Sequence, residues 1–144
     1  MTFFCDTSVL VSACVRQHPH YTRARVVLEA VVTRQSQGVI SIHSLGEMYA
    51  VLTSLPLMPR ILPAEAERMI AINVTQHFRL QSVTGAMYQA AMERCVRQSL
   101  AGGKVYDALI LECARAADCE RIYTFNTRDF CCLAPDLAPR IAAP

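Results

Sequence analysis

The stretch at residues 2–11 constrains the fold more than any other part of the sequence. It reads TFFCDTSVLV, so apolar residues precede a single carboxylate, two hydroxyl residues follow it, and apolar residues then resume. The apolar run before Asp6 predicts a short buried strand. An aspartate at the end of such a strand either caps the next helix or serves as a ligand at the carboxyl edge of a sheet. The function therefore depends on whether other carboxylates reach the same edge.

Short apolar segments alternate with helical patterns along the rest of the chain. We predict strands at residues 3–5, 39–42, 80–83 and 121–124, with an edge strand near Ile141. Helices are predicted at residues 8–15, 21–35, 44–55, 63–78, 85–101 and 104–117, and a polar turn at 125–129. Strands that alternate with helices favour a parallel sheet covered on both faces. The predicted class is α/β, a three-layer α/β/α fold around a mostly parallel sheet of four to five strands.

Composition narrows the class of protein. A chain of 144 residues corresponds to about one domain, which we assign to residues 1–144, and 53% hydrophobic with 18% charged residues indicates an ordered globular chain. No apolar run reaches the ~18 residues of a membrane helix, and the N-terminus does not resemble a signal peptide, so we expect a cytoplasmic protein. Seven cysteines without CxxC pairs predict free thiols rather than disulfides or a zinc site. The net charge of +2 neither indicates nor excludes a nucleic-acid partner.

Four acidic residues are candidates for a common site, namely Asp6, Glu47, Asp107 and Asp129. Asp6, Glu47 and Asp129 each follow a predicted strand, so in a parallel sheet they can meet only beyond its carboxyl edge. Asp107 lies early in an apolar helix, where an uncompensated carboxylate would cost several kcal/mol or take up a proton.

Each carboxylate also has a purely structural interpretation. Asp6 could cap a helix, residues 44–47 match a capping box, and Asp129 could pair with Arg128 or close a turn with Asn126. For any one of these carboxylates alone, the structural interpretation is better than the functional one. For the four carboxylates together it is not, because charges ~4 Å apart repel by about 4 kcal/mol at an effective dielectric constant near 20. Carboxylates gathered at one edge therefore require a cation, and oxygen ligands favour Mg²⁺ or Mn²⁺ over zinc.

A divalent cation held in this way lowers the pKa of a bound water and neutralises charge on a phosphodiester, so water would be the nucleophile. The side chains placed to orient the carboxylates are Thr7, Ser8, Thr124 and Asn126. Lys104 and Arg128 could hold substrate phosphates or could be solvated surface charges. In the loop after the first helix, His18 and His20 are interpreted first as solvent-exposed turn residues and, together with Arg16, second as contacts to a nucleic acid.

Four segments resemble the PIN-domain nucleases, and above all the VapC-type toxins of bacterial toxin–antitoxin pairs. They are FCDTSVL at residues 4–10, SLGEMY at 44–49, VYDALI at 105–110 and YTFNTRDF at 123–130. They occur in the family's order and span most of the chain. Carried over position by position, the family's acidic metal-site residues fall on Asp6, Glu47, Asp107 and Asp129, with Asn126 as the alternative to Asp129 at the inner position.

The resemblance implies a PIN-like fold and an endoribonuclease that cleaves RNA with Mg²⁺ or Mn²⁺. For the toxin branch it also implies a homodimer and a small antitoxin that blocks the site. The alternatives are a housekeeping RNA-processing PIN nuclease and a non-catalytic PIN module that binds RNA or protein. Retention of all four acids argues against the non-catalytic module. A haloacid-dehalogenase-like phosphatase would need a second aspartate where Ser8 stands, and a phosphoacceptor switch would need an acidic pair that the chain lacks.

Overall fold

A five-stranded, all-parallel sheet in the order β3-β2-β1-β4-β5 forms the centre of the protein, which we describe over residues 1–144 from a computed structural model. The strands are β1 (Thr2–Cys5), β2 (Gln37–Ser41), β3 (Arg79–Gln81), β4 (Arg121–Tyr123) and β5 (Ile141–Ala142). Each strand runs parallel to its neighbours. The predicted parallel sheet, including its edge strand near Ile141, is confirmed.

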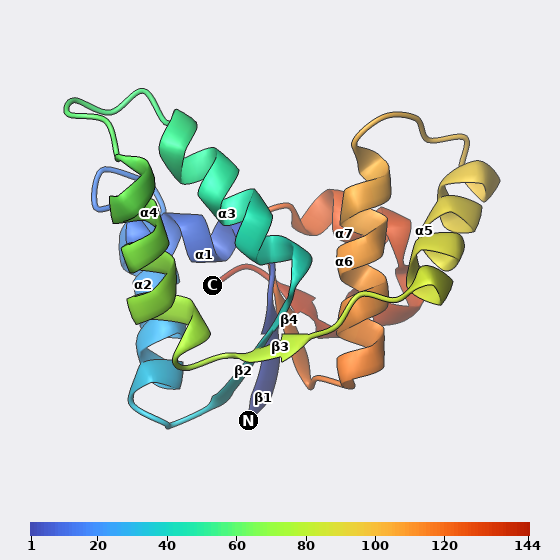
Figure 1. Ribbon diagram of the computed structural model, residues 1–144. Coiled ribbons are helices and arrows are strands. Elements are labelled where there is room, and N and C mark those ends of the chain that lie inside the picture. Colours follow the sequence, from blue (N-terminus) through green and yellow to red (C-terminus); the bar gives the residue numbers. More distant parts are fainter.

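Helices cover both faces of this sheet. They are α1 (Thr7–Cys14), α2 (Tyr21–Val32), α3 (His43–Ser54), α4 (Pro63–Ile70), α5 (Gly85–Arg97), α6 (Lys104–Ala117) and α7 (Thr127–Leu133), with a π-helical turn at Ala71–Thr75 and a 3₁₀ turn at Pro135–Arg140. Figure 1 shows α1–α4 on one side of the strands and α5–α7 on the other. None of these helices combines the length and apolar content that crossing a bilayer requires.

The side-chain alternation of the strands explains the two covered faces. Phe3 and Cys5 of β1 belong to a buried cluster with residues of α1–α4, whereas Phe4 belongs to a second cluster with residues of α5–α7. Successive strand residues point to opposite faces, so one short strand supplies both cores. Strands buried on both faces are continuously apolar, as the sequence of β1 is. The three-layer α/β/α class is therefore confirmed.

The order of the strands determines where a site can form. From β1 the chain moves outward to β2 and β3, and it then returns to place β4 on the other side of β1. Connections that leave in opposite directions open a crevice at the carboxyl ends of the two central strands. Asp6 directly follows β1, and Thr124 directly follows β4. Both therefore stand at this switch point.

Several boundary predictions were wrong. The helix expected over residues 85–101 ends at Arg97, with Ser99 in a left-handed conformation at φ 54°, and the one expected over 63–78 gives way to a π-helical turn after Ile70. The helix expected over residues 21–35 ends at Val32, because Arg34 takes a left-handed backbone conformation with φ 61°. The polar turn expected at residues 125–129 gives way to α7 from Thr127 onward. The first residues of α7 are polar, so this segment was interpreted as a turn. Its buried residues, Phe130 and Leu133, lie one helical turn apart. All seven cysteines are free, as predicted.

Candidate active site

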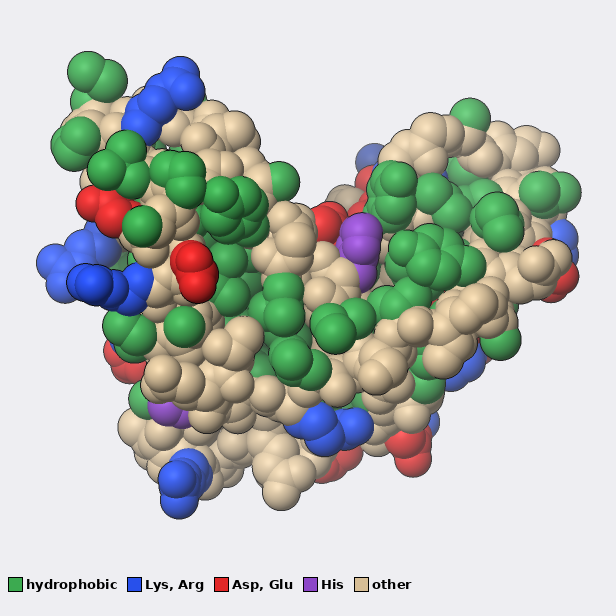
Figure 2. Space-filling view, in the orientation of Figure 1, with side chains coloured by type: hydrophobic (Ala, Val, Ile, Leu, Met, Phe, Trp, Pro, Cys, Tyr) green, Lys and Arg blue, Asp and Glu red, His purple; other side chains and the backbone are tan.

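A cavity of about 580 Å³ lies at the switch point, and its acidic lining residues are Asp6, Glu47 and Asp107. These carboxylates come from three distant parts of the chain, at the starts of α1, α3 and α6. Figure 2 shows a hollow between two lobes in which acidic and histidine side chains meet. Its volume is within the usual range of ligand sites, about 300–1,000 Å³.

Asp6 is the most deeply buried of the three carboxylates, with 6% of its surface exposed. Its Oδ2 accepts hydrogen bonds from Ser8 Oγ at 2.7 Å and from Thr124 Oγ1 at 2.8 Å. Burial raises the pKa of Asp6, and these two hydroxyls oppose that rise. Asp6 occupies the N-cap position of α1 but makes no side-chain capping hydrogen bond. The backbone N–H groups of Thr7 and Ser8 also oppose the rise in its pKa, so the carboxylate is held in place by the start of α1 and by the segment after β4.

Glu47 is oriented by α1. Thr7 Oγ1 lies 3.1 Å from Glu47 Oε1 and 3.0 Å from Ser44 Oγ, and the His43 Nε2 lies 3.5 Å from Glu47 Oε1. Burial raises the pKa of Glu47, His43 and Thr7 oppose the rise, and the charge of Asp6 adds to it. Ser44 is already inside α3, whose N-cap residue is Ile42. The capping-box interpretation is thus wrong, which leaves the Glu47 carboxylate facing the cavity.

Asp107 has a strongly raised pKa. It lies in the first turn of α6, half-buried, and its pKa is raised to about 6 from an ordinary value of 3.8. Burial is the main cause; the charges of Asp6, Glu47 and Asp129 add to the rise, while Lys104 opposes it. A shift of this kind in a cleft is typical of functional carboxylates, because the protein holds like charges near one another.

Asp129 does not line the cavity with the other three acids. Its Oδ2 accepts a 2.5 Å bond from Lys104 Nζ, and this bond lowers the pKa of Asp129. Asn126 lines the cavity instead, and its backbone N–H donates to Thr124 Oγ1 at 3.0 Å. Pairing of Asp129 with Arg128 is not observed, since Arg128 is exposed and makes no salt bridge. Of the two positions that the sequence left open, Asn126 is the one at the cavity.

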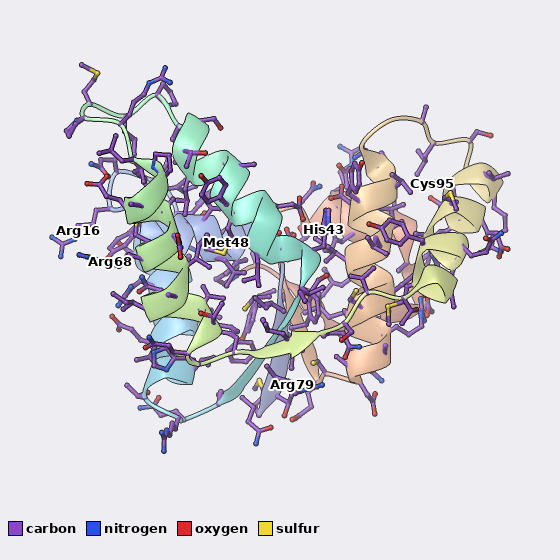
Figure 3. All side chains as sticks on the ribbon, viewed as in Figure 1. Arg16, His43, Met48, Arg68, Arg79 and Cys95 are labelled. Atoms are coloured by element: carbon purple, nitrogen blue, oxygen red, sulfur yellow. The ribbon has the colours of Figure 1, made fainter.

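Sequence reasoning missed Phe125 among the residues that line the cavity. His18 and His20 also line it; they lie in the predicted turn, but they are half-buried rather than solvent-exposed. Arg16, from the same loop, is not among the lining residues, and Figure 3 shows it near Arg68 at the outer edge of the protein. The spacing of four between His43 and Glu47 on one helix was a readable signal of their contact.

At the other side of the cleft, His43 stacks on Tyr106, with ring centroids 5.4 Å apart and planes 9° apart. Figure 3 shows His43 pointing into the space between α3 and α6. The stack joins the helix that carries Glu47 to the helix that carries Asp107.

The donor set suits a hard divalent cation. The carboxylates of Asp6, Glu47 and Asp107 and the amide oxygen of Asn126 are all oxygen ligands, and no cysteine lines the cavity. Burial and then the neighbouring carboxylates raise the pKa of Asp107, and a bound cation would favour its charged form. No group of three or more His, Cys, Asp or Glu side chains is arranged to hold a metal ion.

The model of the PIN domain family matches residues 3–134 of this chain. The chain belongs to the PIN-domain family. Two curated relatives of this PIN domain come from Mycobacterium tuberculosis. Ribonuclease VapC40 is 31% identical over 113 residues, which covers 78% of each chain. Ribonuclease VapC27 is 32% identical over 108 residues, covering 73% of this chain and 71% of the relative.

Solved structures agree with this fold. The Mycobacterium tuberculosis toxin VapC20, described as cleaving the Sarcin-Ricin loop, superposes with a TM-score of 0.67 at 21% identity, covering 88% of this chain and 92% of VapC20. VapBC2 from Rickettsia felis, bound to a DNA fragment from its promoter, superposes with a TM-score of 0.65 at 16% identity, covering 100% and 98% of the two chains. The PIN-like fold is confirmed, and the protein is a distant homologue of VapC ribonucleases.

Proposed function

We propose that this PIN-domain protein is an endoribonuclease that depends on Mg²⁺ or Mn²⁺ and acts as the toxin of a type II toxin–antitoxin pair. The observation that carries the proposal is the convergence of Asp6, Glu47 and Asp107 on one cavity, where burial and then the neighbouring carboxylates raise the pKa of Glu47 and Asp107. Such an arrangement destabilises the metal-free protein, and binding of a cation offsets that cost.

The roles of the chain's own residues follow from their contacts. When bound, the cation would make water a stronger nucleophile and neutralise charge on the phosphodiester. Asp6, fixed by Ser8 and Thr124, would provide the most rigid ligand, and Glu47 would be oriented by Thr7. Asp107, with its raised pKa, must lose its proton before it can serve as a ligand.

At the fourth position of the acidic set, Asn126 and Asp129 would have separate roles. We assign the Asn126 side chain to the cavity and Asp129 to holding Lys104. Arg128, exposed and without a salt bridge, is available for a substrate phosphate. Lys104 keeps 38% of its side chain exposed in its ion pair and could contact a phosphate from there.

RNA as substrate and a small antitoxin as partner are supported by the relatives. VapC40 and VapC27 are named ribonucleases, and the Rickettsia felis structure is a VapBC assembly. We also expect this chain to form a homodimer. The geometry gives no reason to prefer a non-catalytic module, because none of the three cavity carboxylates is neutralised by a salt bridge to Lys or Arg.

The test is RNA cleavage by the purified protein with Mg²⁺, with Mn²⁺ and with a chelator. We expect cleavage only with a divalent cation, and its loss in Asp107→Asn. Glu93→Gln is the matched control, because it neutralises an exposed carboxylate on α5 that has no salt bridge. Expression should arrest growth, and coexpression of the antitoxin should relieve the arrest. RNA cleavage without growth arrest would favour a housekeeping nuclease, whereas absence of cleavage with either cation would contradict the nuclease.

A further inference from the structure

Part of the cavity lining takes no part in the carboxylate chemistry. His20 and Phe125 both line the cavity, and their rings stack with centroids 4.2 Å apart and planes 14° apart. The two residues come from different segments, the loop after α1 and the turn after β4. We call this pair of rings the ledge. The two rings cover each other on one face, and the His18 ring lies 5.6 Å from His20 at a 40° tilt. Both side chains are half-buried, and the rest of their aromatic surface lines the cavity.

His18 holds the loop that carries the ledge. The backbone N–H of His20 donates to His18 Nδ1 at 3.0 Å, so the neutral ring carries its proton on Nε2. That Nε2 lies 3.4 Å from Ser12 Oγ, and Ser12 gives its own proton to the Ser8 carbonyl at 2.7 Å. Burial and the neighbouring His20 lower the pKa of His18, in agreement with a neutral ring. The loop is thus fixed to α1 before any ligand arrives.

The other half of the ledge is tied directly to the carboxylates. Phe125 follows Thr124, whose hydroxyl binds Asp6, and the Phe125 N–H donates to Ser8 Oγ at 3.4 Å. The Arg23 guanidinium lies 5.7 Å from the Phe125 ring centroid, and its Nε donates to the Pro144 carbonyl at 2.9 Å. An RNA strand whose phosphodiester lies at the carboxylates would therefore meet a fixed aromatic surface in the same cavity. The positive charge of Arg23 lies beside that surface.

We propose that the ledge formed by His20 and Phe125 stacks one nucleobase of the RNA strand, beside the phosphodiester held at the carboxylates. The inference rests on the proposed nuclease function and adds a base-binding subsite to it. Flat aromatic rings stack on any base, because every base has a π-face, and single-stranded RNA is commonly held in this way. Because the rings are already ordered, the ledge would bind at little entropic cost. His18 is a positioning residue, and the ledge is the surface that touches the base.

Kinetics with paired substrates and variants test the ledge. His20→Ala and Phe125→Leu should each raise KM for a short RNA by about five- to a hundredfold, the range that one base–aromatic stack spans, with kcat nearly unchanged. His20→Phe, which keeps a ring, should restore the parent KM. Tyr88→Leu is the matched control, because it removes a partly exposed ring of α5 outside the cavity. For an RNA that lacks the base beside the cleaved bond, the KM of the parent protein should rise by the same factor. The KM of His20→Ala should not rise further with this RNA.

A binding measurement separates this inference from the nuclease proposal. The protein is titrated into an RNA decamer that carries 2-aminopurine at alternate positions, in a buffer with Ca²⁺ in place of Mg²⁺. Quenching of the 2-aminopurine fluorescence reports stacking. We expect quenching with the parent and with His20→Phe, and none with His20→Ala at the same concentrations. Quenching without cleavage in Mg²⁺ would sustain the ledge and refute the nuclease. Cleavage with equal KM for intact and abasic RNA, or His20→Phe as impaired as His20→Ala, would overturn the ledge and leave the nuclease standing.

Discussion

Replacing Asp107 by Asn should stabilise the metal-free protein while it removes activity. The pKa of Asp107 rises from 3.8 to about 6 on folding, so the folded state binds the proton more tightly than the unfolded state does. The folded state therefore loses stability as pH rises through that interval, and the cost is complete above about pH 6. A shift of this size corresponds to about 3 kcal/mol, which screening by solvent at a half-buried group reduces to about 1–2 kcal/mol.

Thermal unfolding at two pH values with a chelator present measures this effect. At pH 7.5 we expect Asp107→Asn to raise Tm by about 3–7 °C, and at pH 3 to leave Tm nearly unchanged, because the carboxyl is then largely protonated in both states. Glu93→Gln, the surface control, should leave Tm unchanged at both pH values. Mn²⁺ at a hundred times its Kd should stabilise the parent by about 2.7 kcal/mol and the variant by much less.

The direction of the shift is the decisive result. If Asp107→Asn lowered Tm at pH 7.5 in chelator, the carboxylate would be stabilising the fold through a favourable contact. Burial together with proximity to other negative charges would then be the wrong explanation for its raised pKa. Equal activity of the variant and the parent on RNA would separately remove Asp107 from the catalytic machinery.

Three further outcomes follow from other contacts. Thr124→Val removes a hydroxyl that donates to the buried carboxylate after β1, so urea unfolding should show a loss of about 1.5–3 kcal/mol that Thr124→Ser largely restores. Because the pKa of Asp107 is about 6, Mn²⁺ affinity measured by calorimetry should fall as pH drops from 7 to 5, and a flat profile would count against Asp107 as a ligand. Gly38→Ala would place a Cβ 2.4 Å from the buried Phe78 ring, costing about 1–3 kcal/mol in chemical denaturation. Gly46→Ala, with open space around its Cβ, should not destabilise the protein, and equal losses at both glycines would refute the packing argument.

Much of the fold could be predicted because its strands and helices have strong local patterns. The helix predicted at residues 104–117 matches α6 in full, since its apolar centre and the preceding glycine pair leave little ambiguity. The parallel sheet followed from the alternation of elements, and the parallel sheet in turn predicted that Asp6 and Glu47 would meet. Such inferences depend on topology, which a short sequence pattern can specify.

The parts of the site that could not be predicted depend on side-chain direction and on contacts between distant residues. Asp129 follows β4 as expected, but α7 begins there and turns it toward Lys104 and away from the cavity. Likewise, His20 and Phe125 are more than a hundred residues apart in the sequence, so no local pattern predicts that their rings stack. Only the three-dimensional structure brings these two rings together.

The central claim is that Asp6, Glu47 and Asp107 share a divalent cation, and anomalous diffraction from crystals grown with Mn²⁺ tests it most directly. The account predicts an anomalous peak inside the cavity in contact with carboxylate oxygens of Asp6 and Asp107, and its loss in Asp107→Asn. A cavity without a peak at saturating Mn²⁺, with the three carboxylates in their metal-free positions, would contradict the account.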